Sequence, residues 1–301
     1  MSQEPVFLAG PGLVPVRLLG LRDGRRTELL RDEATGRLYV MRTVEPDVPP
    51  LERARLAREG ERQPDVRVHW EDSHLSVLRP YIPGRPLSDR LLAGGLLSVR
   101  EAIKLSADVL GQLRPLHSAG RAHRDLRPDT IVLADTADGG AALVLDLEFV
   151  DAPALRRALR EEAPAVGYLA PEQSGVIDRP VDARADLYSL GLILFESLSG
   201  KRPFDGADVR DVLHQHLSAP VPRVRALNPI VPRALDDYIA RLLRKDPEDR
   251  HRDAAEALAD LHRVAVALHS SRPGLDPGRT LTEARMAGRS AQLSALLRRA
   301  E

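Results

Sequence analysis

The chain has 301 residues, of which 43% are hydrophobic and 29% are charged. This composition supplies enough apolar material for a sizeable core and excludes a wholly disordered chain. Lysine plus arginine and aspartate plus glutamate each number 44, which gives a formal net charge of +0. Binding to nucleic acid or to an anionic membrane needs a basic surplus, so neither partner is expected.

The chain contains no cysteine. Disulfides, thiolate metal sites and thiol nucleophiles are therefore excluded, which fits a reducing cytosol. No apolar run approaches the ~18 residues that are needed to span a bilayer. The first residues are acidic, whereas a signal peptide begins with basic residues. We expect a soluble, cytoplasmic protein.

The first third of the chain has the residue alternation and the turn residues that are typical of β-strands. The predicted strands cover residues 13–21, 27–30, 37–43, 66–70 and 75–79. A proline pair at 49–50 precedes a predicted helix over residues 51–62. A proline-rich stretch at 80–86 then interrupts regular structure, and we interpret it as a boundary between two lobes.

The rest of the chain is predicted to be mainly helical. Ser98 and Glu101 form a capping-box pattern at the start of a helix that Gly120 ends. A strongly apolar helix over residues 187–198, ended by Gly200, is expected to run through the centre of this lobe.

Smaller elements complete the prediction. A hairpin is expected to join strands at 131–133 and 141–147. Further capping boxes begin at Asp253 and at Thr280, and a linker rich in proline and glycine at 272–278 separates them. The last helix carries an apolar stripe, for which either the C-lobe or a partner is the expected docking surface.

An ordered set of short motifs follows the predicted boundary. It comprises His123-Arg124-Asp125, Asp146-Leu147-Glu148, Ala170-Pro171-Glu172, Asp186 to Gly191, and Asp246-Pro247-Glu248-Asp249-Arg250. In this order the motifs resemble those of the protein kinases, specifically the eukaryotic-like Ser/Thr kinases of bacteria. The resemblance implies an α+β, bilobal protein-kinase fold with a β-rich N-lobe and a helical C-lobe. It divides the chain into a leader (1–16), an N-lobe (17–82), a C-lobe (83–263), and a linker with a C-terminal helix (264–301).

The resemblance assigns roles to several residues of the C-lobe. Asp125 would be the general base, next to Arg127 in the place of the usual lysine. Asp146 would be the main Mg²⁺ ligand. Glu172 and Arg250 would form a buried ion pair, while Asp186 would accept hydrogen bonds from the catalytic-loop backbone.

The elements that would bind the nucleotide depart from the family pattern. Gly20 starts the glycine loop, but arginines 22 and 25 stand where further glycines belong, so their side chains would keep the backbone away from phosphates. Arg42 replaces the strand lysine and is a larger planar fork. Glu52, or alternatively Glu59, is its expected glutamate partner.

Other departures lie at the adenine pocket and at the metal site. Arg79 occupies the usually apolar gatekeeper position, and the hinge donor to adenine would lie near Ile82. Thr130 replaces the asparagine that binds Mg²⁺, and a neutral hydroxyl is a poorer ligand for this hard cation. Glu148 replaces a glycine, and its carboxylate is a possible metal ligand.

The activation segment, from 149 to 168, contains no serine or threonine. Glu161 and Glu162 stand where a phosphorylated residue is expected, and two carboxylates approximate the charge of a phosphate. Arg124 would be their partner. The alternative is a solvated acidic turn.

These departures favour a pseudokinase that acts as a regulatory or scaffolding module through a protein partner. The expected cofactor is none, or ATP bound weakly, with Mg²⁺ or Mn²⁺ only if nucleotide binds. An atypical Ser/Thr kinase of low activity that uses Asp125 and Asp146 is the alternative. A small-molecule phosphotransferase is disfavoured by Ala170-Pro171-Glu172, which resembles an element for docking polypeptides.

Overall fold

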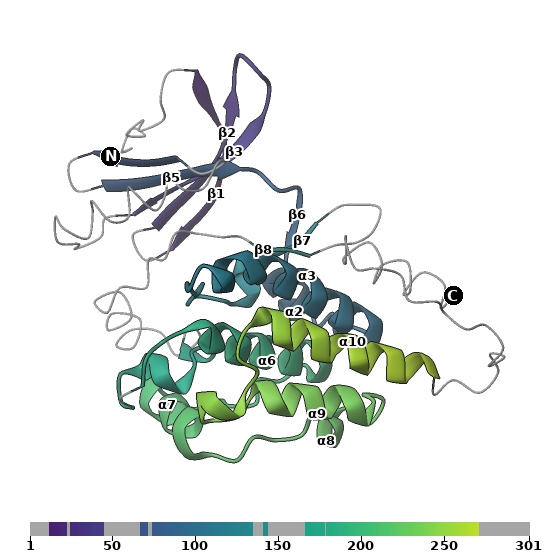
Figure 1. The fold of residues 1–301 in the computed structure, drawn as a ribbon. Coiled ribbons are helices and arrows are strands. Elements are labelled where there is room, and N and C mark those ends of the chain that lie inside the picture. The colour runs from purple at the N-terminus through teal and green to yellow at the C-terminus, as the bar shows by residue number, and fades with distance from the viewer. Residues whose placement is uncertain are drawn as a thin grey trace. The chain divides into compact units, whose positions relative to one another are not determined.

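The computed structural model describes residues 12–22, 25–44, 67–71, 74–134, 141–143, 166–177 and 179–270. These residues form two compact units, of which one ends at Pro83 and the other begins at Gly84 (Figure 1). The predicted leader, the predicted helix over 51–62 and the predicted C-terminal helix lie wholly or largely outside the described residues.

The first unit is built on a five-stranded antiparallel sheet with the strand order β1-β2-β3-β5-β4. Its strands are β1 (Leu13–Arg22), β2 (Arg25–Asp32), β3 (Leu38–Val44), β4 (Arg67–Glu71) and β5 (His74–Pro80). They confirm the predicted strands: β1, β2 and β5 are one to four residues longer than predicted, and β3 and β4 are shifted by one residue. Leu29, Leu30, Val40, Met41 and Val77 are buried in this unit.

The edge strand β1 is irregular. Its register against β2 shifts between Pro15 and Arg17 and again between Leu18 and Gly20. Val16 and Leu19 are therefore left without a partner in the ladder, as in β-bulges. Bulges twist an edge strand and make it a poorer template for another chain.

The second unit is mainly helical, as predicted. Its helices are α2 (Leu87–Leu92), α3 (Val99–Ser118), α6 (Ala183–Ser199), α7 (Val209–Ser218), α8 (Val224–Leu227), α9 (Arg233–Leu242) and α10 (Ala254–Ser270). Short 3₁₀ turns are η1 (Pro128–Thr130), η2 (Pro171–Ser174) and η3 (Pro247–Asp249). A small antiparallel sheet comprises β6 (Gly84–Pro86), β7 (Ile131–Ala134) and β8 (Ala141–Leu143). Its β7–β8 pair is the predicted hairpin.

Helix α6 forms the centre of this unit, and most of its residues are buried. It starts at Ala183 because the Asp182 side chain accepts a hydrogen bond from the Arg184 backbone N–H at 2.9 Å. It ends at Gly200, whose φ of 74° is left-handed. Gly191 lets α9 approach closely, since a Cβ there would lie 2.9 Å from a Leu243 methyl group.

The predicted capping boxes differ in outcome. At the start of α3, Ser98 and Glu101 cap each other's backbone N–H groups, which confirms the box. At α10, Asp253 caps Glu256 at 2.9 Å, but the Glu256 carboxylate accepts from the Arg252 backbone N–H instead of that of Asp253. Only half of the second box is therefore formed.

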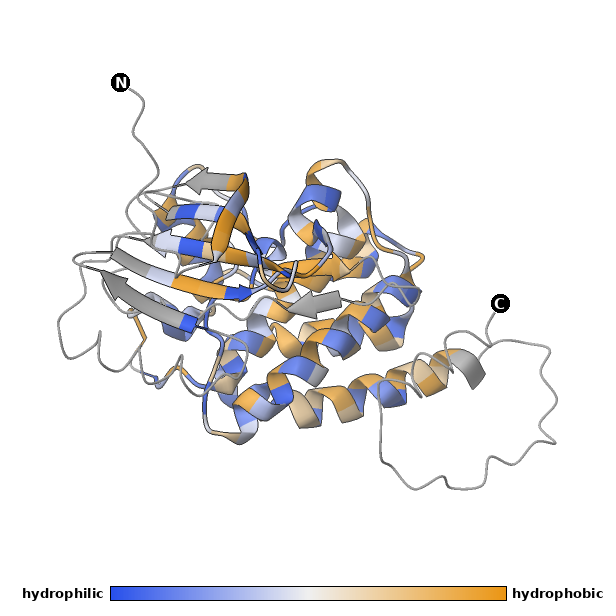
Figure 2. Cartoon of the chain, turned by 90° about the horizontal axis from the view of Figure 1, so that it is seen from above, coloured by the Kyte–Doolittle hydropathy of each residue, from blue (hydrophilic) through white to orange (hydrophobic). Residues whose placement is uncertain are grey.

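Helix α10 continues to Ser270, so residues 264–270 are helical although the sequence placed them in the linker segment. Figure 2 shows apolar and polar residues side by side along the helices of this unit. Among the described residues, no helix has the length and apolar character that a membrane crossing requires.

Candidate functional site

The loop between α3 and β7 carries Asp125, and its backbone is anchored by the buried side chain of Asp186. The two Asp186 carboxylate oxygens accept hydrogen bonds from the backbone N–H groups of His123 at 2.6 Å and Arg124 at 2.7 Å. His117 Nδ1 accepts from the Ala254 backbone N–H at 3.0 Å, so its Nε2 proton is donated to Asp186, also at 3.0 Å. The hydrogen bonds that the resemblance implied for Asp186 are present.

Asp125 and Arg127 form an ion pair within the loop. Arg127 Nε lies 2.9 Å from Asp125 Oδ1, and Arg127 Nη2 donates to Asp125 Oδ2 at 3.4 Å. Arg127 Nη1 also lies 3.6 Å from an Asp129 carboxylate oxygen. The Asp125 side chain is 30% exposed. The arginine fork therefore holds the carboxylate that would have to accept a substrate proton.

Thr130 is turned into the loop. Its hydroxyl oxygen accepts from the Arg127 backbone N–H at 3.0 Å, and its proton faces the carbonyl oxygens of Arg127 at 2.9 Å and Asp125 at 3.3 Å. Only 2% of the residue is exposed. A hydroxyl has one proton and two lone pairs; its loop uses the proton and one lone pair, and burial shields the other. The residue in the place of the magnesium-binding asparagine does not fit a metal ligand.

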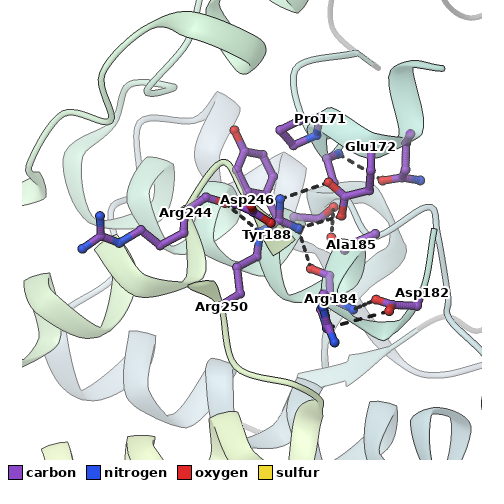
Figure 3. A network of polar contacts seen from close by, with 12 residues as sticks. Pro171, Glu172, Asp182, Arg184, Ala185, Tyr188, Arg244, Asp246 and Arg250 are labelled. Atoms are coloured by element: carbon purple, nitrogen blue, oxygen red, sulfur yellow. Dashed lines mark hydrogen bonds and ion pairs between the residues drawn. The ribbon is translucent and has the colours of Figure 1, made fainter. Parts of the chain in front are cut away.

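Arg250 and Glu172 form the buried ion pair that the resemblance implied (Figure 3). Arg250 Nη1 and Nη2 donate to the two Glu172 oxygens at 2.7 and 3.0 Å, and the side chains are 0% and 1% exposed. The other guanidinium protons go to the carbonyls of Arg244 at 2.7 Å and of Arg184 and Lys245 at 3.0 Å. All five donors of the guanidinium are thus used.

A second polar cluster surrounds Tyr188. The Arg250 guanidinium lies 4.7 Å from the centre of the Tyr188 ring, and the Tyr188 hydroxyl is 3.1 Å from His216 Nδ1. Lys245 Nζ donates to the Gln215 carbonyl at 3.0 Å and lies 3.7 Å from the centre of the Phe204 ring. Burial, with the nearby Arg250 charge, lowers the pKa of Lys245 to about 7. Burial, with the charge of Lys245, lowers the pKa of His216 to about 3.

The turn before Glu172 is anchored to α6. The Tyr168 hydroxyl donates to Glu196 at 2.5 Å, and the Ser189 hydroxyl donates to the Tyr168 carbonyl at 2.7 Å. Burial raises the pKa of Glu196, although its hydrogen bond from Tyr168 acts in the opposite direction. The residues around Ala170-Pro171-Glu172 are therefore tied by hydrogen bonds to the central helix of the unit.

In the first unit, the sheet brings two predicted site residues to one face. Arg42 lies opposite Val77, and Arg79 lies opposite Val40. Because side chains alternate between faces and paired residues share a face, Arg42 and Arg79 occupy diagonal positions on one side of the sheet. Both are partly buried.

The start of the predicted glycine loop is a regular strand pair. Gly20 is paired with Thr27, and the pairing continues to Arg22 opposite Arg25. At the other end of the sheet, Ile82 follows β5, and the neighbouring Tyr81 backbone N–H donates to the Leu38 carbonyl at 2.9 Å.

Several predicted site residues lie outside the described residues: Glu52, Asp146, Glu148, Glu161 and Glu162. Their roles, and the pairing of Arg124 with the two glutamates, stay predictions. Among the described residues, the Arg124 side chain makes a weak contact from Nη2 to the Val181 carbonyl at 3.5 Å.

The sequence analysis missed His117, Gln173 and Lys245. His117 is one of several polar residues on an amphipathic helix, and Gln173 directly follows the Ala170-Pro171-Glu172 motif without being part of it. Lys245 carries a weak signal, because it is one of very few lysines in a chain rich in arginine. A compact ammonium that packs against a ring is a contact in which lysine and arginine differ.

Comparisons with known proteins agree with this geometry. The family model for the protein kinase domain matches residues 66–261. Serine/threonine-protein kinase PksC of Streptomyces coelicolor is 32% identical over 211 residues, covering 67% of this chain and 37% of PksC. PknL of Mycobacterium tuberculosis is 32% identical over 202 residues (65% and 48%), and PknB of Mycobacterium leprae is 35% identical over 212 residues (69% and 32%).

The matched region spans about a third to a half of the length of these relatives. A crystal structure of Rad53 residues 1–466 in complex with AMP-PNP has a TM-score of 0.65 and 20% identity, and the match covers 82% of this chain and 64% of that one. This likeness shows the fold. The chain belongs to the protein kinase domain family and, within it, to the eukaryotic-like Ser/Thr kinases that bacteria have.

Proposed function

We propose that this kinase domain is a pseudokinase, which acts as a regulatory or scaffolding module by binding a protein partner. The proposal rests on a contrast within the second unit. The contacts that stabilise the kinase architecture are formed, whereas the two described residues at expected metal and proton positions, Thr130 and Asp125, are engaged within their own loop.

Thr130 is the observation that carries the proposal. Its buried hydroxyl is bonded to the backbone of its own loop, with Arg127 N–H and O at 3.0 and 2.9 Å. Phosphoryl transfer depends on metal ions that neutralise developing charge. A loop whose metal-binding position is replaced by an internal cap is expected to retain its shape and to lose this function.

Further substitutions act in the same direction. Arg42 and Arg79 place two cations diagonally on one face of the sheet, where the family pattern has a lysine and an apolar residue. Loss of one preorganised charge-stabilising group typically costs ~3–4 kcal/mol of transition-state stabilisation. Even with strong non-additivity, the transition-state stabilisation lost at several altered groups exceeds what one additional carboxylate at Glu148 would restore.

An atypical, weakly active Ser/Thr kinase is the second candidate. It is favoured by Asp125, whose carboxylate is present and 30% exposed beside a cationic side chain. In this alternative Asp125 accepts the substrate proton and Asp146 holds the metal.

A thermal-shift titration with ATP, with and without Mg²⁺ or Mn²⁺, tests the proposal. A ligand at 100 times its dissociation constant adds about 2.7 kcal/mol, which corresponds to roughly 5–10 °C for a domain of this size. We expect little or no shift at millimolar ATP. A clear rise that Asp146→Asn abolishes would favour the weakly active kinase over the pseudokinase.

A further inference from the structure

The backbone of Arg124 adopts an unusual conformation. Its φ is 64°, and among the described residues no other non-glycine residue has a positive φ. The left-handed region is unfavourable for any residue with a Cβ. Such a conformation persists where the surroundings impose it, so the contacts of the peptide groups on either side of Arg124 are decisive.

Two buried side chains hold these peptide groups from opposite sides. On the N-terminal side, the Arg124 N–H donates to Asp186 Oδ1 at 2.7 Å. On the C-terminal side, Gln173 Nε2 donates to the Arg124 carbonyl at 2.7 Å. Asp186 comes from α6 and Gln173 comes from η2, so two separate elements fix one residue.

Gln173 is itself fixed in place. It is 3% exposed, and its Oε1 accepts from the Ala170 backbone N–H at 3.0 Å. The Gln173 backbone N–H donates back to the Ala170 carbonyl at 2.9 Å. The amide therefore joins the turn around Glu172 to the carbonyl that immediately precedes Asp125.

We propose that Gln173 is a positioning residue which, together with Asp186, imposes the left-handed turn at Arg124 and thereby sets the position of the Asp125 carboxylate. The proposal goes beyond the proposed function, because it concerns the position of Asp125 and does not depend on whether a nucleotide is bound or turned over. It makes the turn at 170–174 and the loop that carries Asp125 one coupled unit.

The chemistry of the contact requires a side chain with a donor and an acceptor at the same end. Glutamine provides both, and its two hydrogen bonds use them. Methionine has a similar volume but lacks a strong donor, so the Arg124 carbonyl would lose its bond from Gln173. A charged glutamate would present only acceptors to that carbonyl. A protonated glutamate would again donate.

Hydrogen exchange of the intact chain tests the proposal, with peptides that cover residues 123–126 and, as a reference, residues 187–194 of α6. We expect Gln173→Met to accelerate exchange at 123–126 by about ten-fold or more, because a lost buried hydrogen bond of typical strength corresponds to such a factor. Exchange in α6 should change much less. Gln215→Met is the matched control, because the Gln215 side-chain amide also donates and accepts, but its hydrogen bonds go to the Asp205 backbone, at 2.7 and 3.2 Å, and not to Arg124 or to the turn at 170–174.

Gln173→Glu supplies a second, pH-dependent measurement. Relative to wild type at the same pH, exchange at 123–126 should be fast at about pH 8 and should recover toward wild type at about pH 5, as the buried carboxyl group becomes a donor. A structural effect of altered volume would show no such recovery.

Three outcomes would overturn the proposal: unchanged exchange at 123–126 in Gln173→Met, equal acceleration in α6, or equal acceleration at 123–126 by Gln215→Met. If Gln173→Met does not fold, Gln173→Glu decides alone. Recovery on lowering the pH then supports the proposal, and exchange that is the same at both pH values overturns it.

Discussion

Replacing Glu172 by glutamine should destabilise the protein strongly, although the side chain keeps its shape. The carboxylate accepts two bonds from Arg250, at 2.7 and 3.0 Å, and both side chains are essentially unexposed. Glu172→Gln leaves a guanidinium without its counter-charge and turns an amide NH₂ toward one of its donors. Removing one partner of a buried ion pair typically costs ~3–5 kcal/mol. For a domain of roughly 150–250 residues this corresponds to a decrease in Tm of roughly 6–20 °C.

The assay is urea and thermal unfolding followed by circular dichroism, in which the midpoint should fall while the m-value is unchanged. Asp205→Asn is the control. It breaks the ion pair of Arg202 and Asp205, which has the same 2.7 Å separation, but Asp205 is 67% exposed. Exposed pairs contribute ~0–1 kcal/mol. A decrease for Glu172→Gln no larger than that of the control would refute the reasoning that burial makes this pair a structural clamp.

Three other measurements address the predicted nucleotide-binding residues, the partly buried Lys245 and the C-terminal segment. The combined variant Arg42→Lys, Thr130→Asn and Glu148→Gly should not transfer radiolabelled phosphate to a generic protein substrate. The reason is that Arg22 and Arg25 remain beside the β1–β2 turn and Arg79 remains at the expected gatekeeper position. A transfer rate typical of active kinases would contradict this prediction. The pKa of Lys245 is about 7 in the folded chain and near 10.4 in the unfolded chain. The unfolded chain therefore binds more protons between these pH values, and the free energy of unfolding should rise with pH across this window. In urea unfolding, Lys245→Met should show a smaller rise, and parallel curves of unfolding free energy against pH would contradict the assignment. Deletion of residues 279–301 should lower the Tm without changing the mass in solution if this segment docks on its own domain, whereas loss of a dimer or complex at constant Tm would indicate a partner-binding helix.

The sequence predicted elements well where the signal is local. Strand alternation, the box at Ser98 and the stop at Gly200 depend on neighbouring residues, and all three are present. The box at Asp253 failed in part because its glutamate had two backbone N–H groups within reach and accepts from that of Arg252. Local spacing does not distinguish between such neighbours.

The site was predictable only where a motif carried it. The ion pair of Glu172 and Arg250 joins residues 78 positions apart, and the resemblance alone brought them together. The shared face of Arg42 and Arg79 needed the register of β3 against β5, which alternation within one strand does not fix. The bond from Gln173 to Arg124 needed the backbone conformation at Arg124 as well.

The contacts that stabilise this domain and those that would catalyse phosphoryl transfer lie on different residues. Asp186, Glu172 and Arg250 are at most 3% exposed and fully bonded, so their loss would cost folding energy whatever the domain does. Thr130, which the resemblance places where the family has a metal ligand, shows the reverse: its hydroxyl caps the loop from within. Selection for a stable surface alone would therefore preserve the first set, Asp186, Glu172 and Arg250, and would tolerate changes in the second set, the residues of phosphoryl transfer. A scaffold needs only the first set, and a kinase needs both, which is why nucleotide binding is the measurement that separates them.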